Sequence, residues 1–111
     1  SLAQHIDAAA VVAFSTSGTT AVRLSRERPR LPIVMMTPNQ SIRQRMNFLW
    51  GINSILTGSF DSFDDALDGI SRLMLENEMG APGDQVIVVA GTPFGVVGST
   101  NTIRVLSLHK S

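Results

Sequence analysis

An uninterrupted run of seven apolar residues, from Ala8 to Phe14, constrains the fold of this chain more than any other feature. A strand with one solvated face alternates apolar and polar residues, whereas a strand buried on both faces is apolar throughout. The length of the run and its β-branched pair Val11 and Val12 therefore predict a buried strand. Small hydroxyl residues and a glycine follow it in residues 15–20, where a loop is expected.

Helical and strand patterns alternate along the rest of the chain. Apolar residues at Ile42, Met46 and Leu49 have helical spacing, and Ser62 with Asp65 has the form of a capping box. The predicted helices cover residues 19–28, 41–50 and 62–79, and the further predicted strands cover residues 33–36, 52–56, 85–90 and 102–108.

The order of these elements predicts the class of fold. Strands that alternate with helices indicate a mostly parallel sheet covered on both faces, and no helical pattern separates the last two strands. The last strand is therefore expected to be antiparallel. The expected fold is a three-layer α/β/α arrangement around a five-stranded mixed sheet with strand order 3-2-1-4-5, formed by residues 1–111 as a single domain.

Composition excludes several classes of function. Apolar residues make up 43% of the 111 residues, and nine basic residues balance nine acidic ones. This balance argues against nucleic acid or an anionic membrane as the main partner, because both attract a basic surface. The 111 residues contain no cysteine and no apolar run of the roughly 18–20 residues that span a membrane, and no signal peptide is visible in them. A cytoplasmic location is expected, and the absence of an initial methionine favours a fragment of a longer protein.

Two loops rich in Ser, Thr and Gly are expected to meet at one edge of the sheet. Residues 15–20 follow the first strand and residues 91–100 follow the fourth, on either side of the point where the strand order reverses. Residues 15–20 also precede a helix, whose free N–H groups and dipole attract anions such as phosphate. The alternative interpretation is ordinary helix capping, which uses the same residue types.

Six stretches, spread over nearly the whole chain, resemble the C-terminal domain of pyruvate kinases and occur in the same order. They are residues 8–21, 25–30, 32–33, 83–89, 91–93 and 98–102. The resemblance implies a glycolytic parent protein, a cytoplasmic tetramer that transfers phosphate from phosphoenolpyruvate to ADP. Its catalytic residues, Mg²⁺ and K⁺ would lie in a barrel absent from this chain. We therefore expect no catalytic residue, metal or cofactor in this domain, and no activity from it alone.

The resemblance also implies an allosteric site for a sugar phosphate or AMP. The residues that it assigns to the effector phosphate are Ser15, Thr16, Ser17, Gly18 and Thr20, and those of the closing loop are Gly95 and Gly98. Members regulated by fructose 1,6-bisphosphate commonly have a basic residue where this chain has Thr16 and Thr19. They also hold the second phosphate with Trp and Arg, whereas residues 62–79 contain Arg72 as their only basic residue. A monophosphate is therefore expected, or no effector.

Other polar and aromatic residues have simpler interpretations. Carboxylates at Asp61, Asp64, Asp65 and Asp68 suit the start of a helix better than a metal site. The two histidines, His5 and His109, have no evident partner. Trp50 is expected in the core or at a subunit contact. The four arginines Arg23, Arg26, Arg28 and Arg30 form either a solvated helix face or a contact for an anion or a subunit.

Two alternatives to a pyruvate kinase domain stay open. One is a freestanding α/β domain of the same fold that acts as a small-molecule sensor or as an enzyme. The other is a purely structural oligomerisation module.

Overall fold

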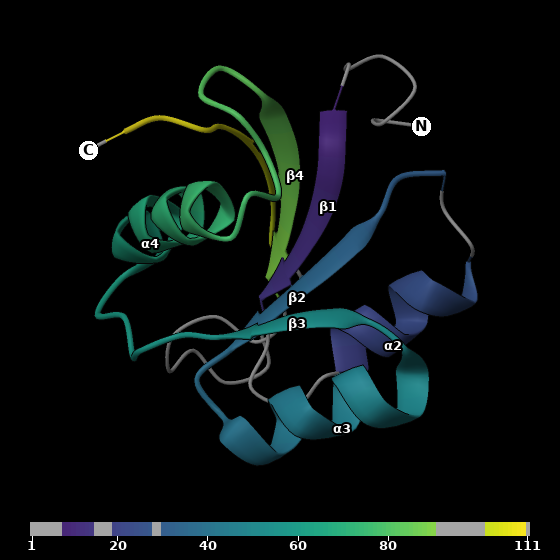
Figure 1. The fold of residues 1–111 in the computed structure, drawn as a ribbon. Helices are drawn as coiled ribbons and strands as arrows, with labels where there is room; N and C mark the ends of the chain where they lie inside the picture. The colour runs from purple at the N-terminus through teal and green to yellow at the C-terminus, as the bar shows by residue number, and fades with distance from the viewer. Residues whose placement is uncertain (1–7, 15–18, 28–29, 91–101, 111) are drawn as a thin grey trace.

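A computed structural model describes residues 8–14, 19–27, 30–90 and 102–110, which form a five-stranded sheet between helices (Figure 1). The elements are β1 (Ala8–Phe14), α2 (Thr19–Arg26), β2 (Ile33–Thr37), α3 (Gln40–Trp50), β3 (Asn53–Leu56), α4 (Phe63–Glu76), β4 (Gln85–Ala90) and β5 (Thr102–Ser107). The strand order is β3-β2-β1-β4-β5, with β5 antiparallel to β4 and the other neighbours parallel. The predicted α/β/α fold and strand order are confirmed.

The central strand β1 is buried on both faces, as its apolar run predicts. It pairs in parallel with β2 on one side and with β4 on the other. Val12 lies in the hydrophobic cluster that includes α4, whereas Ala13 lies in the cluster that includes α2 and α3. Because successive side chains of a strand point to opposite faces, the continuously buried stretch from Ala10 to Phe14 needs an apolar residue at every position.

Helices α2 and α3 cover one face of the sheet. Asn39 caps the start of α3 by accepting a hydrogen bond from the Ile42 amide, and Gly51 ends the helix in the left-handed region at φ 63°. Met46 is buried against the sheet, but Leu49, predicted on the same buried stripe, is 70% exposed. Trp50 is 43% exposed, which excludes the first of its two expected places, the core; the second, a subunit contact, stays a prediction.

Helix α4 covers the other face with Leu67, Ile70 and Met74. Ser62 caps its start by accepting from the Asp65 amide, as the capping box predicts. The helix ends at Glu76 and not at residue 79, because Asn77 closes it and Glu78 takes a left-handed φ of 58°. Helix α2 likewise ends at Arg26, before the predicted residue 28, which lies outside the described residues.

The end of the chain is held to α4 by one buried hydroxyl. Ser71 Oγ accepts a hydrogen bond from the His109 amide at 2.8 Å and donates one to the His109 carbonyl at 3.0 Å. The neighbouring Leu108 is buried in the core. His109 Nε2 also lies 3.9 Å from Asp68 Oδ1, which corrects the expectation that this histidine has no partner.

A Ser71→Ala variant should lose about 1–2 kcal/mol of unfolding free energy, because the paired groups of His109 lose their partner. Urea denaturation measures the loss, and faster hydrogen exchange at the His109 amide locates it. Ser59→Ala, at an exposed position, is the matched control and should change stability by less than about 0.5 kcal/mol. Equal stability of the two variants would show that the hydroxyl does not hold the terminus.

Helix α4 has a glycine at the point where an aromatic ring packs against it. A Cβ built on Gly69 would overlap the ring of Phe60, which itself contacts Phe14 with a ring-centroid separation of 5.7 Å. Phe14 is the last residue of β1, so this packing supports the carboxyl edge of the central strand.

We expect Gly69→Ala to destabilise the fold by about 1–2 kcal/mol, although alanine is normally the better helix former by about 1 kcal/mol. The control Gly58→Ala places its methyl group where no atom lies within 4 Å, and it should be nearly neutral. Thermal and urea unfolding of both variants test the expectation. In the double variant Phe60→Ala/Gly69→Ala the ring is absent, so the methyl group at position 69 should no longer cause a steric loss of stability. A Gly69→Ala protein as stable as the parent would refute the steric argument.

Candidate functional site at the carboxyl edge of the sheet

The two predicted loops leave from neighbouring strand ends. Phe14 at the end of β1 is paired with Ala90 at the end of β4. The chain proceeds from β1 to β2 on one side, whereas β4 lies on the other side, so the strand order reverses between β1 and β4. This is the position where open α/β sheets bind ligands. The strand ends from which the two loops leave are therefore neighbours, and the meeting of the loops themselves stays a prediction.

The loops themselves carry most of the predicted phosphate ligands and lie outside the described residues. These candidates are Ser15, Thr16, Ser17, Gly18, Gly95 and Gly98. Thr20 lies in the first turn of α2, where its backbone is described. Assignment of these seven residues to a phosphate site stays a prediction.

Helix α2 begins at this edge, and no acidic residue in its first turn offsets the positive end of its dipole. Its first turn contains no acidic residue, whereas the first turn of α4 contains Asp64 and Asp65. The positive end of a helix dipole is equivalent to about half an elementary charge. The edge next to β1 and β4 therefore favours an anion, while the start of α4 is already neutralised.

Buried groups hold the neighbouring strand ends in place. Thr37 at the end of β2 is fully buried, and its hydroxyl accepts a hydrogen bond from the Asn39 amide at 3.2 Å. Its carbonyl accepts from the Thr57 amide, just beyond β3, at 2.8 Å. Together with the contact between Phe14 and Phe60, these bonds give the edge a rigid base.

Arg104 was not among the residues considered from the sequence. It places a cation near the start of α4, at the same carboxyl edge of the sheet. Arg104 lies on β5 opposite Val88, and its guanidinium carbon is 5.3 Å from the ring centroid of Phe63 at the start of α4. By contrast, Arg72 lies in the second half of α4, away from this edge, and 4.0 Å from Glu76. The sequence feature that could have pointed to Arg104 is a charged residue between the apolar Ile103 and Val105 of a strand.

The acidic residues near this edge belong to the start of a helix. Asp64 and Asp65 occupy the first turn of α4, as predicted, and Asp61 and Asp68 lie on either side of that turn. The described part of the chain contains no group of three or more His, Cys, Asp or Glu side chains that could hold a metal ion. None of its helices is long and apolar enough to cross a membrane.

Comparisons with known proteins agree with this geometry. Residues 1–106 match the sequence model of the family described as pyruvate kinase, alpha/beta domain. Pyruvate kinases of Agrobacterium vitis and Corynebacterium glutamicum are each 38% identical over 104 residues, which cover 94% of this chain and 22% of each relative. A pyruvate kinase of Mycobacterium tuberculosis is 36% identical over 104 residues, with the same coverage. The chain thus spans about a fifth of the length of these relatives.

Solved structures show the same fold. The structure of Cryptosporidium parvum pyruvate kinase in complex with ADP matches 96% of this chain and 21% of its own, with a TM-score of 0.80 and 20% sequence identity. A second pyruvate kinase structure from that organism matches with a TM-score of 0.78 and 19% identity. The match over residues 1–106, together with the shared fold, shows that this chain belongs to the pyruvate kinase alpha/beta domain family.

Proposed function

We propose that this chain is the regulatory and subunit-contact domain of a pyruvate kinase and that it binds a phosphorylated effector at residues 15–20. The observation that carries the proposal is the pairing of Phe14 with Ala90 at the point where the strand order reverses. It brings the origins of two loops rich in Ser, Thr and Gly together beside the start of α2.

A single phosphate suits this edge better than two. Residues 15–20 contain five hydroxyl residues, one glycine and no basic residue. Hydroxyl groups, backbone amides and the α2 dipole together provide donors and a partial positive charge. A bisphosphate carries up to about four negative charges, which neutral donors compensate poorly. A sugar monophosphate or AMP is therefore the proposed effector, and Arg104 supplies a further positive charge on the α4 side.

The catalytic activity belongs to the whole protein in this proposal. The chain spans about a fifth of its relatives, so the reaction of phosphoenolpyruvate with ADP takes place in the larger part outside these residues. We assign Mg²⁺ and K⁺ to that part, as the resemblance to pyruvate kinases implies. The full protein would act in glycolysis, as a cytoplasmic oligomer.

A phosphorylated effector should raise the melting temperature of the 111-residue chain in a thermal-shift screen. We would test glucose 6-phosphate, ribose 5-phosphate, AMP and fructose 1,6-bisphosphate, and expect at least one monophosphate to stabilise the protein more than the bisphosphate. A ligand at about 100 times its Kd adds about 2.7 kcal/mol, a shift of several degrees. Inorganic phosphate at the same ionic strength separates specific binding from a general anion effect.

Charge variants locate the site. Ser17→Asp places a carboxylate in the proposed phosphate loop and should abolish the thermal shift. Ser41→Asp makes the same change in the first turn of α3, at an exposed position, and should leave the shift intact. A shift that survives Ser17→Asp but disappears with Ser41→Asp would move the site to α3. A screen in which no ligand shifts the melting temperature would favour a purely structural domain.

The isolated chain should produce no pyruvate from phosphoenolpyruvate and ADP with Mg²⁺ and K⁺ present. The full-length protein, assayed in parallel, provides the positive control for a lactate-dehydrogenase-coupled assay. Measurable turnover from the purified 111 residues, proportional to protein concentration, would instead support a freestanding enzyme of the same fold.

A further inference from the structure

A hollow of about 280 Å³ lies between the second half of α4 and the end of the chain. Three of its lining residues, Arg72, Leu75 and Glu76, come from α4, and the other two, His109 and Lys110, follow β5. Most of the surface that it exposes is apolar. Its volume is close to the lower end of the range for small-molecule sites, about 300–1,000 Å³. The hollow therefore suits a small ligand with an apolar part.

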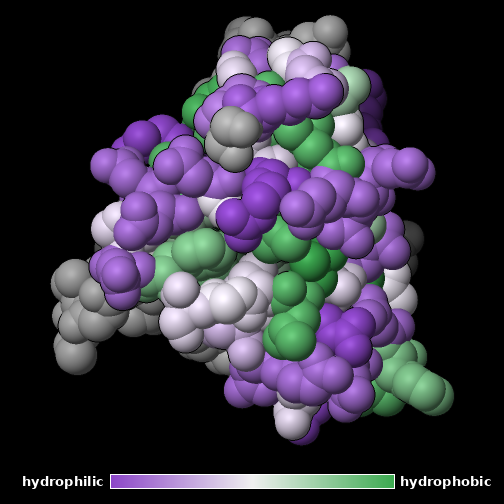
Figure 2. All heavy atoms as spheres, turned by 60° about the vertical axis from the view of Figure 1, so that its left-hand side comes forward, coloured by the Kyte–Doolittle hydropathy of each residue, from purple (hydrophilic) through white to green (hydrophobic). Residues whose placement is uncertain are grey.

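This hollow lies at the amino edge of the sheet, away from the proposed effector site. Ser107, the last residue of β5, pairs with Gln85, the first residue of β4. The residues that follow Ser107 therefore lie at the edge where the parallel strands begin. Figure 2 shows the side of the molecule that bears α4, where apolar side chains appear between hydrophilic ones.

The two walls of the hollow are joined before any ligand binds. The buried Ser71 hydroxyl on α4 bonds both the amide and the carbonyl of His109, at 2.8 and 3.0 Å. The His109 ring is held as well, because its Nδ1 lies 3.1 Å from the Ser107 carbonyl. A carbonyl oxygen only accepts, so Nδ1 carries the hydrogen of this bond. A ligand would therefore enter a hollow whose walls are already ordered, which lowers the entropic cost of binding.

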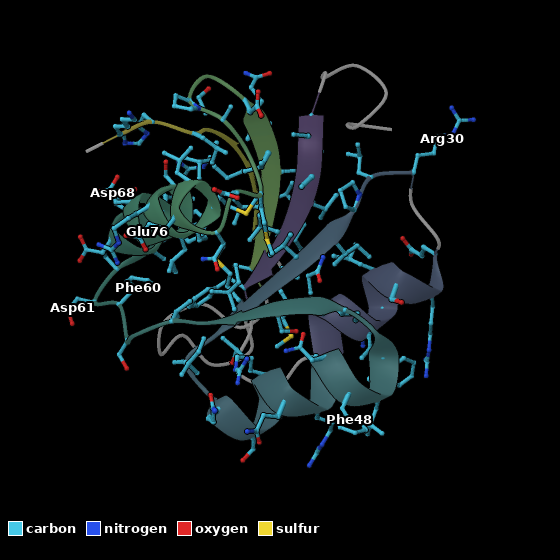
Figure 3. All side chains as sticks on the ribbon, in the orientation of Figure 1. Arg30, Phe48, Phe60, Asp61, Asp68 and Glu76 are labelled. Carbon is cyan, nitrogen blue, oxygen red and sulfur yellow. The ribbon has the colours of Figure 1, made fainter. Side chains whose placement is uncertain are left out.

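The rim of the hollow carries more positive than negative charge. Lys110 is exposed and forms no ion pair with another described residue. Arg72 Nε lies 4.0 Å from Glu76 Oε1, and both side chains are more than half exposed, so this pair is weak. Asp68 and Glu76 both project from α4 (Figure 3), but Asp68 does not line the hollow and lies 3.9 Å from His109 Nε2. One carboxylate thus faces two permanent cations.

We propose that this hollow binds a small monocarboxylate with an apolar chain or ring. The ligand's carboxylate accepts hydrogen bonds from Arg72 and Lys110, and its apolar part covers Leu75. A phosphate group suits the hollow less well, because its second negative charge would lie near Glu76 and nothing would cover the apolar surface. This site is separate from the effector edge and does not depend on the function proposed for that edge.

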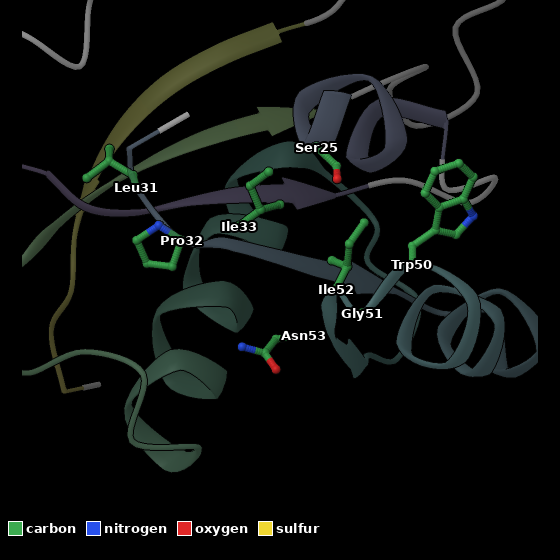
Figure 4. A pocket seen from close by; sticks show the side chains of 8 residues that line it. All are labelled: Ser25, Leu31, Pro32, Ile33, Trp50, Gly51, Ile52 and Asn53. Atoms are coloured by element: carbon green, nitrogen blue, oxygen red, sulfur yellow. The ribbon is translucent and has the colours of Figure 1, made fainter. Parts of the chain in front are cut away.

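The other hollow of similar size lacks this combination of charge and apolar surface. It has a volume of about 320 Å³ and lies at the end of α3, beside Trp50 (Figure 4). None of its lining side chains is ionisable, and most of the surface that it exposes is polar. The carboxylate site is therefore assigned to the α4 hollow alone.

Photolabelling of the full-length protein with a diazirine analogue of pentanoate tests the proposal. Peptides that contain residues 72–76 and 109–110, identified by mass spectrometry, should be labelled in a saturable way. Hexanoate should compete with the probe. Hexanamide keeps the apolar chain without the charge, and acetate keeps the charge without the chain. Each should compete about tenfold less well than hexanoate, because both parts of the ligand contribute to binding.

Charge variants on the rim separate this hollow from a general attraction of anions. Lys110→Ala should weaken labelling of these peptides about two- to fivefold, and Glu76→Gln should strengthen it by removing the opposing carboxylate. The matched controls are Arg45→Ala on α3 and Asp64→Asn at the start of α4, which make similar charge changes elsewhere and should leave this labelling unchanged. All four residues are exposed, so the variants should fold normally.

Each outcome decides the proposal. Saturable labelling of both peptides, with hexanoate as the best competitor and opposite effects of the two rim variants, supports it. Equal competition by hexanamide or by acetate overturns it, as does labelling that Lys110→Ala leaves unchanged or that occurs only on other peptides. Effector binding plays no part in this experiment, so an effector screen without a hit leaves its outcome unaffected.

Discussion

Burial of β1 on both faces is the constraint on which the rest of the structure depends. A strand without a solvated face needs a partner strand on each side and helices above and below, and β1 has β2 and β4 beside it. Val12 and Ala13, at successive positions, belong to separate hydrophobic clusters, one formed with α4 and the other with α2 and α3. The three layers therefore follow from the apolar character of a single strand.

The same central strand determines where the polar chemistry lies. Because β1 has later strands on both sides, the order reverses beside it, and its carboxyl end meets that of β4. Both strand ends therefore lie on the side of the sheet where α2 begins, and the first turn of α2 has no acidic residue. The packing of Phe60 on Phe14, permitted by Gly69, makes the base of this edge rigid. A rigid base is what a loop needs to hold an anion in one position.

The amino edge of the sheet differs in chemistry from the carboxyl edge. It presents apolar side chains among arginines, and the helices that reach it, α2 and α3, both start at the carboxyl edge. Helix α2 thus extends from the strand-order reversal, where it begins at Thr19, to Arg26, which lies over Trp50. The chain is neutral as a whole, yet α2 and α3 together contain four basic residues and no acidic one, whereas α4 contains four acidic residues and one basic residue. A net charge of zero therefore does not mean that the charges are evenly distributed over the surface.

The sequence by itself determined the elements, the strand order and the pairing of the two strand ends from which the loops leave. These follow from local patterns, such as the apolar run of β1 and the capping box at Ser62, because backbone geometry and burial repeat with short periods along the chain. Only the tertiary structure decided which apolar residues are covered. Leu49 shares a helical stripe with Met46, but only Met46 is buried against the sheet, and Leu49 and Trp50 are exposed. It also decided which distant polar groups meet, as with Ser71 and His109 or Arg104 and Phe63, because the sheet register that aligns them joins residues far apart in sequence.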